Sequence, residues 1–480
     1  MTCTFNLCSL VTCTRAHTGT GTHTHTQGKW HQGFYKKAHT PTFRGFDTYT
    51  GSYTNNDHFA FVDGGNVSRT APYAYNVSNC MLKDLANSTG GSIGNAAAEQ
   101  INRDGYTARV YAAESERLVA AHAAAATATP GAPETARNAS TAPAVAPFFL
   151  YAAFTVVHEP TEAPAESVAR YNSTIADPKR RTLGGMVWEL DIAVGRVHAA
   201  LKAVGMWENT ILWFSTDNGS PISNGGNNAP LRGSKMTYWE GGVRAVSFIA
   251  SPLLRTARAG SNAGGGVGAD GYRRWSGLVA QPDVYYTLAK LAGVTDLILQ
   301  NNSGPIAPDG VNVWPAIVAG AASPRGEVVH NINGQRPGAI LLGDLKLIVG
   351  PPNQAGRGID NWPLPPEATP AANGGGLEGG LLRPCLAASC PCVSQPCLFN
   401  VSADPDERND LAGSLPSEVA RLLARFRELQ KTEVRLEDSG LCPQTVLPDG
   451  SVYNQGGLPD ASLPDGCAAN AAGGHWQPWM

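Results

Sequence analysis

Residues 210–254 read TILWFSTDNGSPISNGGNNAPLRGSKMTYWEGGVRAVSFIASPLL. The apolar run at 211–214 predicts a short buried strand, and a second apolar run at 246–250 predicts another. The first strand ends on a pair of oxygen-bearing side chains, Asp217 and Asn218. Open α/β sheets hold their ligands beyond the carboxyl ends of their strands. Because hard oxygen ligands suit divalent cations, this pair indicates a metal site.

A Gly- and Asn-rich loop follows the strand and carries two cations, Arg232 and Lys235. Cationic side chains in such a loop are typical of anion binding. Together with the oxygen pair they indicate an anion held beside a divalent cation.

Further candidate site residues come from earlier in the chain, some of them at the same predicted sheet edge. The apolar run 147–154 predicts a strand that leads into His158, and the periodic segment 182–204 predicts an amphipathic helix before the strand at 211. Strand, helix and strand in this order predict a parallel βαβ unit. A lone histidine past a strand is more often structural, but His158 falls at the ligand edge. Lys29 and His31 would share one side of an extended segment. Alone they are weak candidates, and a solvated pair is the ordinary interpretation.

These patterns predict an α/β fold with a mostly parallel sheet sandwiched by helices and a smaller C-terminal α+β subdomain. Further helices are expected within 96–125 (with Arg109, Tyr111 and Leu118 on its apolar side), at 282–291 and at 415–431, and further strands within 327–349. The predicted domains are a low-complexity leader (1–26), a catalytic domain (27–320) with an Ala/Pro-rich, poorly ordered insertion (about 120–144), the subdomain (321–435) and an irregular tail (436–480).

The amino-acid composition indicates which binding partners and which cellular compartment to expect. The net charge of -3 gives no reason to expect nucleic acid or an anionic membrane, and no apolar run reaches transmembrane length. Of ten cysteines, four cluster at 385–397 with spacing that favours disulfides over zinc. Asn-x-Ser/Thr sequons also favour the secretory pathway, lysosomal or extracellular, although the first residues show no signal peptide. The sequons lie at Asn66, Asn76, Asn87, Asn138, Asn172, Asn301 and Asn400. Asn218 also begins a sequon, but a buried metal ligand could not carry a glycan.

Several segments in order resemble the sulfatase family of the arylsulfatase B type, within the alkaline-phosphatase-like superfamily. They are Gly28-Lys29-Trp30-His31, Arg44-Gly45-Phe46-Asp47, Val157-His158-Glu159-Pro160, Ser215 to Gly219, Trp239 to Gly242 and Pro396 to Asn400. The resemblance covers residues 27 to about 430. It implies hydrolysis of sulfate esters, of the arylsulfatase or N-acetylgalactosamine-4-sulfatase type, on a sulfated small molecule or sulfated glycan.

The resemblance also implies residue roles. Asp217 and Asn218 match calcium ligands, and Lys29 and His31 match residues beside the nucleophile. His158 and Lys235 match residues that contact the sulfate oxygens and assist the leaving group. The physical chemistry agrees, since lysines attract a sulfate ester and a histidine can carry a proton.

Two family features are missing from this sequence. The family's formylglycine is made from the cysteine of a C-x-P-x-R motif, and an Asp-Asp pair supplies further metal oxygens; neither motif occurs here. We therefore expect a truncated or mispredicted gene start before Gly28, no turnover by this chain, and uncovered strand edges near Phe148 and Ile211. Two alternatives stay open: a non-catalytic binder of sulfated glycans, and a phosphodiesterase of the same superfamily.

Overall fold

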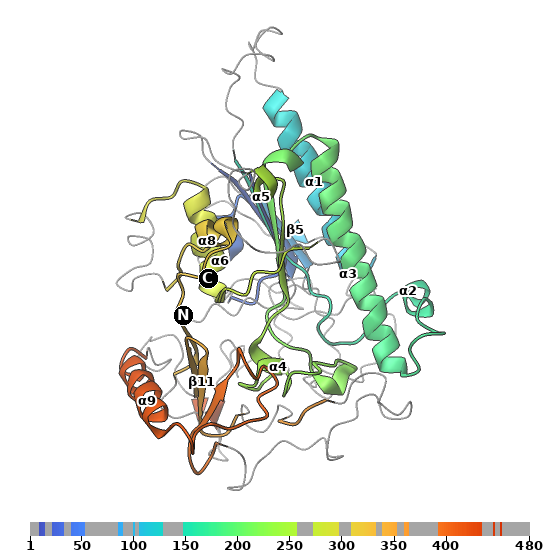
Figure 1. The fold of residues 1–480 in the computed structure, drawn as a ribbon. Coiled ribbons are helices and arrows are strands. Elements are labelled where there is room, and N and C mark those ends of the chain that lie inside the picture. The colour runs from blue at the N-terminus through green and yellow to red at the C-terminus, as the bar shows by residue number, and fades with distance from the viewer. Residues whose placement is uncertain are drawn as a thin grey trace.

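The computed structural model shows a large mixed sheet between helices and a smaller sheet beside it (Figure 1). It describes residues 9–14, 22–32, 40–52, 85–89, 99–100, 105–127, 147–256, 272–296, 309–332, 338–352, 360–363, 392–433, 445–446 and 452–453.

The main sheet has the strand order β5-β4-β3-β2-β6-β1-β7-β8. Its strands are β1 (Ser9–Thr14), β2 (His23–Lys29), β3 (Thr48–Ser52), β4 (Leu85–Thr89), β5 (Glu99–Gln100), β6 (Phe148–Ala153), β7 (Thr210–Ser215) and β8 (Ser247–Ala250). Both strands predicted in 210–254 are confirmed as β7 and β8, and the strand predicted at 147–154 is confirmed as β6.

The strands that lead to the candidate residues share one direction. β2 pairs in parallel with β3 and with β6, while β1 lies antiparallel between β6 and β7, so β7 also runs parallel to β6. The parallel α/β frame is confirmed, with antiparallel strands at β1, β4 and β8.

The prediction of uncovered strand edges was wrong for this structure. Ser9 faces both Ala153 and Ser215, and the pairing continues along β1, so the edges of β6 and β7 are both occupied. The leader supplies the missing strand because its Thr- and Val-containing segment favours extended backbone and pairing needs only main-chain groups. Within the predicted low-complexity leader (1–26), the structure has β1 and the start of β2.

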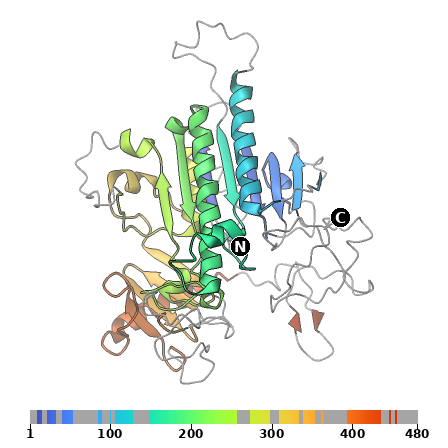
Figure 2. The ribbon, with the colours of Figure 1, turned by 90° about the vertical axis from the view of Figure 1, so that its right-hand side faces the viewer.

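Helices cover both faces of the main sheet (Figures 1 and 2). Helices α1 (Thr107–Thr127) and α3 (Pro178–Ala203) lie on one face, where Leu150 and Phe214 join their core. The other face carries α6 (Gln281–Leu291) and α8 (Trp314–Ala319), packed on Tyr151 and Trp213. Successive residues of one strand therefore enter different cores, as strand geometry requires. The remaining short helices are α2 (Ala165–Ala169), α4 (Glu240–Val243), α5 (Leu253–Thr256), η2 (Pro41–Phe43), η4 (Trp207–Asn209) and η5 (Ile222–Asn224).

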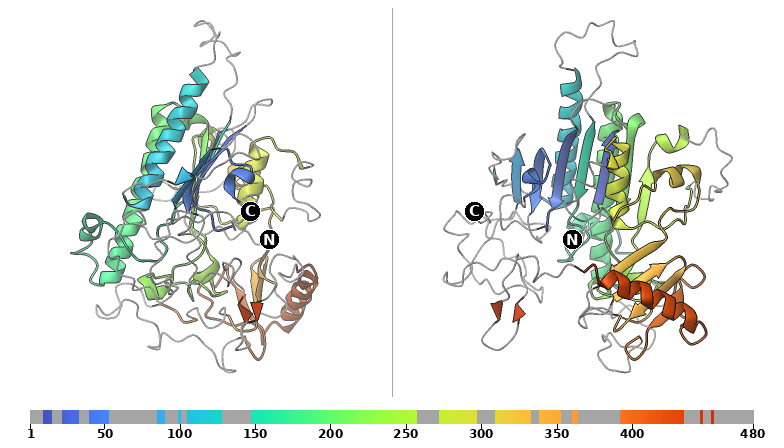
Figure 3. Two further views of the ribbon diagram at one scale, coloured as in Figure 1. Left: turned by 180° about the vertical axis from the view of Figure 1, so that it is seen from behind. Right: turned by 90° about the vertical axis from the view of Figure 1, so that its left-hand side faces the viewer.

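The second sheet is antiparallel, with the order β12-β11-β10-β9 (Figure 3). Its strands are β9 (Glu327–Asn331), β10 (Gly338–Leu342), β11 (Leu345–Val349) and β12 (Cys397–Asn400). Helix α9 (Pro416–Gln430) packs on one face through Leu422 and Phe426. The opposite face packs on Tyr238 and Trp239 of the 231–244 segment. The smaller subdomain is thus confirmed, and its sheet contacts the loop that follows β7.

Other expectations have mixed outcomes. The helices at 182–204, 282–291 and 415–431 are confirmed as α3, α6 and α9. Tyr111 and Leu118 are buried on α1, as predicted. Arg109 does not pack in an apolar core, because its guanidinium forms ion pairs with Glu189 and Glu166.

The insertion predicted at 120–144 begins later, because α1 continues to Thr127; residues 128–146 lie outside the described residues. Cys392 and Cys397 form a disulfide, which excludes the four-cysteine zinc alternative, while Cys385 and Cys390 lie outside the described residues. In the tail, β13 (Thr445–Val446) pairs with β14 (Val452–Tyr453). Among the described helices, none combines the length and apolar content that crossing a membrane requires.

Candidate functional site

The predicted site residues follow the carboxyl ends of three strands of the main sheet. Lys29 ends β2, His158 follows β6, and Asp217 and Asn218 follow β7. Because these strands run in one direction, all of these positions belong to the same sheet edge. The topology therefore brings Lys29, His158 and the Asp217–Asn218 pair to one edge.

The end of β2 approaches β6 unusually closely. Gly28 has φ of 92°, and a Cβ atom at this position would lie 1.8 Å from the carbonyl oxygen of Ala153. Only glycine fits both conditions. This contact fixes where the chain turns into Lys29.

Lys29 and Lys235 form the electrostatic centre of the edge. The Lys29 side chain is only 4% exposed. Burial, with a smaller contribution from the nearby charge of Lys235, lowers the pKa of Lys29 to about 8, while Asp217 opposes the shift. A buried ammonium with a second ammonium nearby favours an anion between or beside the two groups.

His31 belongs to the same group of charges, although not for the reason predicted. Its φ of 47° places it in the left-handed region, so Lys29 and His31 do not share an extended segment. Burial, then the charges of Lys29 and Lys235, lower the pKa of His31 to about 4, although the ring still meets solvent. At neutral pH His31 is therefore a neutral imidazole beside two cations.

His158 lies in the turn after β6. Its backbone N–H donates to the carbonyl of Thr155 at 3.0 Å, and its Nδ1 lies 2.7 Å from the carbonyl oxygen of Glu159. A carbonyl can only accept, so this contact requires a proton on Nδ1 and leaves Nε2 as the acceptor in the neutral ring. The contact orients the imidazole.

The Asp217–Asn218 turn is held against α4. The N–H of Gly219 donates to the carbonyl of Gly242 at 3.0 Å, and a Cβ atom on Gly219 would lie 1.7 Å from the carbonyl oxygen of Gly241. Cβ atoms on Gly241 and Gly242 would lie 2.4 Å from the carbonyl oxygens of Arg232 and Thr237, so close backbone contact explains the Gly-Gly pair as well.

Asp217 and Asn218 do not make a complete calcium site. Calcium takes six to eight oxygen ligands, and two side chains provide too few. Within the described part of the chain, no group of three or more His, Cys, Asp or Glu residues could hold a metal ion. The assignment of these two residues as metal ligands stays a prediction.

Arg232 does not contribute to the anion site as expected. Its guanidinium is buried between the rings of Trp239 and Trp362, 3.6 and 4.1 Å from their centres. Its Nε donates to the carbonyl of Asp360 at 2.8 Å. Arg232 therefore anchors the loop, and of the predicted cation pair only Lys235 is coupled to Lys29 and His31.

Sequence reasoning also missed a buried charge cluster behind α4. The Lys346 ammonium of β11 lies 2.9 Å from Glu240 Oε1 and 2.8 Å from Glu407 Oε1. Glu407 Oε2 accepts from the N–H of Glu240 at 2.6 Å. The available signal was a lysine between leucines in a predicted strand, where a charge is rarely fully buried unless it is paired.

The chain is similar to proteins of known family. The sulfatase family model matches residues 14–294. Arylsulfatase J from Mus musculus is 32% identical over 428 residues, 85% of this chain and 60% of that protein. Arylsulfatase A from Homo sapiens is 26% identical over 296 residues, 61% of this chain and 49% of that protein. The chain therefore spans less than two thirds of the length of these relatives.

The crystal structure of Ps i-CgsB in complex with k-i-k-neocarrahexaose has a similar fold. The TM-score is 0.56 at 22% sequence identity, with 85% of this chain and 72% of that chain covered. Since the family model covers more than half of the chain, the family is established: the chain belongs to the sulfatase family.

Proposed function

We propose that the edge formed by Lys29, Lys235 and His158 binds the sulfate group of a sulfate ester. The observation that carries this proposal is the electrostatic coupling of Lys29 and Lys235 in a largely buried environment. Within the described residues, the Lys235 ammonium forms no ion pair. A dianion or monoanion at this edge would offset the repulsion between the two lysines.

The residues divide the work of binding and proton transfer. Lys29 and Lys235 attract the sulfate oxygens as point charges. His158 is oriented through Nδ1, and in its protonated form its Nε2 can donate a proton to the ester oxygen as the leaving group departs. His31 is neutral at pH 7 and adds no charge of its own. No step is assigned to a metal ion, because the described residues supply too few ligands.

The reaction that this site serves in the proposal is the hydrolysis of a sulfate ester, on a sulfated small molecule or a sulfated glycan. Support comes from the family and from relatives named as arylsulfatases. The 480 residues contain neither C-x-P-x-R nor Asp-Asp. We therefore propose that this polypeptide binds sulfate esters without turnover. A secretory location also remains a proposal, supported by the Cys392–Cys397 disulfide and by the exposed sequon at Asn172.

Calorimetric titration of the 480-residue chain with an aryl sulfate tests the binding. The expected result is saturable binding that weakens about tenfold or more in Lys235→Met and persists in Arg421→Ala, a surface control. Equal affinity in Lys235→Met, or no binding by the parent chain, would contradict the proposal.

A turnover assay separates binder from enzyme. The chain is coexpressed with a formylglycine-generating enzyme and incubated with the aryl sulfate and calcium. Product release at the rate of the blank is expected. Turnover above the blank that disappears in Lys235→Met would show an enzyme and overturn the proposed lack of turnover. Cleavage of an aryl phosphodiester in preference to the sulfate would favour the phosphodiesterase alternative.

A further inference from the structure

The loop that carries Lys235 is fastened on both of its flanks to the C-terminal part of the chain, while the Lys235 N–H itself donates to the carbonyl of Ser220, after β7, at 3.5 Å. Backbone N–H groups of Gly233 and Tyr238 donate to the carbonyls of Asn361 and Pro352, at 3.1 and 2.8 Å. The indole N–H of Trp239 donates to the carboxylate of Asp360 at 2.8 Å. Anchors on both sides of Lys235 thus come from segments beyond residue 350.

Lys235 and its neighbour Met236 are the part of this loop that stays accessible. Met236 is 38% exposed, and its φ of 73° marks a tight turn. The flanking residues Ser234 and Thr237 are buried and linked through the Thr237 hydroxyl, which donates to the Ser234 carbonyl at 2.8 Å. The loop therefore presents Lys235 at a tip whose base is fixed by buried contacts.

The strongest fixed contact at that base is the Lys346–Glu240–Glu407 cluster. Glu240 opens α4, and Lys346 and Glu407 belong to the C-terminal subdomain. Burial alone would raise the pKa of Glu240, but Lys346 outweighs it and lowers that pKa below its ordinary value. Burial raises the pKa of Glu407 despite the same ammonium. One buried cation is thus shared by two carboxylates that depend on it.

We propose that Lys346 is a positioning residue: by pairing with Glu240 and Glu407 it fixes the loop that presents Lys235 at the anion-binding edge. The C-terminal sheet then sets the separation of Lys235 from Lys29, although Lys346 itself contacts neither of these two lysines. This inference rests on the proposed function for its meaning, since Lys235 is the sulfate contact there. The positioning itself can be measured without any ligand.

The test reads the ionisation of Lys29 in the full chain. Labelling of lysines with a small acylating reagent is followed against pH by mass spectrometry, which yields the apparent pKa of Lys29. Lys235→Met is the reference and should raise that pKa by about half a unit or more, because a like charge is removed. Lys346→Met should raise it in the same direction if the loop has moved Lys235 away.

Two further variants distinguish positioning from general loss of stability. Leu422→Ala removes a buried side chain of α9 in the same subdomain, at a cost similar to that of Lys346→Met, without touching the loop. It should leave the pKa of Lys29 unchanged. Glu240→Gln keeps the side-chain shape and leaves one ammonium with one carboxylate, so it should fold and shift Lys29 by a smaller amount. If Lys346→Met does not fold, the apparent pKa of Lys29 in Glu240→Gln tests the inference.

The outcomes separate cleanly. A shift in Lys346→Met or Glu240→Gln without one in Leu422→Ala supports the inference. An equal shift in Leu422→Ala overturns it, as does an unchanged Lys29 in folded Lys346→Met and Glu240→Gln, or in Lys235→Met itself. Failure of aryl sulfate to bind the parent chain, with the Lys29 shifts present, would remove the proposed function and leave the positioning intact.

Discussion

Two buried lysines of this molecule have opposite surroundings. Lys346 is 0% exposed and lies within 3 Å of two carboxylates. Lys29 is 4% exposed, and the neighbouring charge that shifts its pKa most is that of another lysine, Lys235. Similar burial therefore accompanies two carboxylates beside the ammonium of Lys346, but a second ammonium, Lys235, opposed by the carboxylate of Asp217, near that of Lys29.

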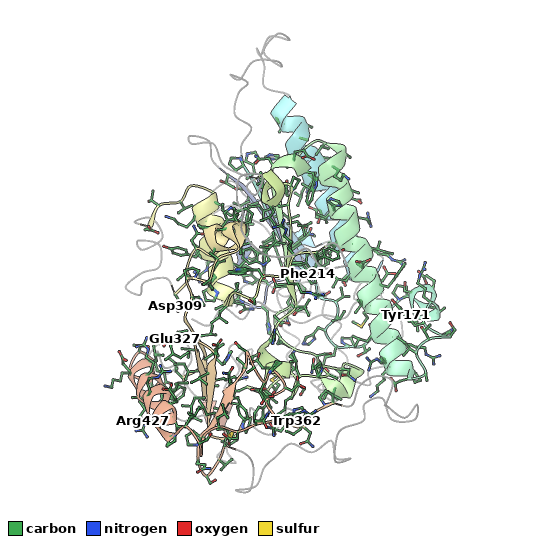
Figure 4. The ribbon with its side chains drawn as sticks, viewed as in Figure 1. Tyr171, Phe214, Asp309, Glu327, Trp362 and Arg427 are labelled. Carbon is green, nitrogen blue, oxygen red and sulfur yellow. A yellow bond between two sulfur atoms is a disulfide. The ribbon has the colours of Figure 1, made fainter. Side chains whose placement is uncertain are left out.

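This contrast distinguishes a buried charge that stabilises the fold from a buried charge that is available to bind a ligand. A buried ammonium with its counter-charges in the protein stabilises the fold only as long as the set stays complete. A buried ammonium beside a second cation lowers the stability of the folded state, and this cost is offset when an anion arrives. Trp362, labelled in Figure 4, is one of two tryptophans that enclose the guanidinium of Arg232, a buried cation held by aromatic rings.

Lys346→Met is expected to produce the largest effect. Two carboxylates would be left in a buried site without their cation, so unfolding free energy should fall by about 4 kcal/mol. Urea denaturation at pH 7 measures it. The double variant Lys346→Met/Glu407→Gln should recover part of the loss, because one of the stranded charges is gone. No recovery would show that the packing of the lysine stem, not its charge, matters.

Lys29→Met should act in the opposite direction. The pKa of Lys29 in the folded protein is about 8, below its ordinary 10.5, so folding disfavours its charged form. The destabilisation of the folded state by this charge is complete below pH 8, where Lys29 is protonated in both states. It decreases as the pH rises from about 8 to 10.5, because Lys29 of the folded protein loses its proton first. The variant should thus be more stable than the parent by on the order of 2 kcal/mol at pH 7, with the gap shrinking toward pH 10. Denaturation at both pH values checks this, and a destabilised variant would break the contrast with Lys346.

Trp362→Phe probes the cation between two rings. The substitution keeps an aromatic face for Arg232 but weakens the cation–π contact and removes the indole N–H that donates to the carbonyl of Asp406 at 2.6 Å. A loss of about 1 kcal/mol is expected. Thermal denaturation provides the measurement; a loss as large as that of Lys346→Met would mean that the rings, rather than the carboxylates, dominate this region.

Arg421→Ala should have the smallest effect. Arg421 and Glu418 lie 2.6 Å apart on α9, but both side chains meet solvent. Exposed pairs of this kind contribute about 0.5 kcal/mol or less. The same denaturation experiment should show almost no change. A loss above about 1 kcal/mol would indicate that short charge pairs stabilise this protein regardless of burial.

The sequence predicted the frame of the site better than its support. Strands β6 and β7 were found because their apolar runs are buried on both faces, and the turn after β7 placed Asp217 and Asn218 at the sheet edge where Lys29 and His158 also lie. Arg232 was misplaced because residue type alone does not reveal whether a cation faces solvent or two tryptophans. Lys346 escaped notice because its partners, Glu240 and Glu407, are distant in sequence and the pairing depends on two domains coming together.

The position of β1 has a consequence for the order in which the chain can fold. Ser9 faces Ala153 on one side and Ser215 on the other, so β1 closes the gap between two strands that leave the ribosome much later than β1 does. The centre of the main sheet cannot be completed until β7 has been made. During synthesis the segment 9–14 must wait without its partners, and substitutions there should alter the yield of folded protein more than the stability of the finished molecule.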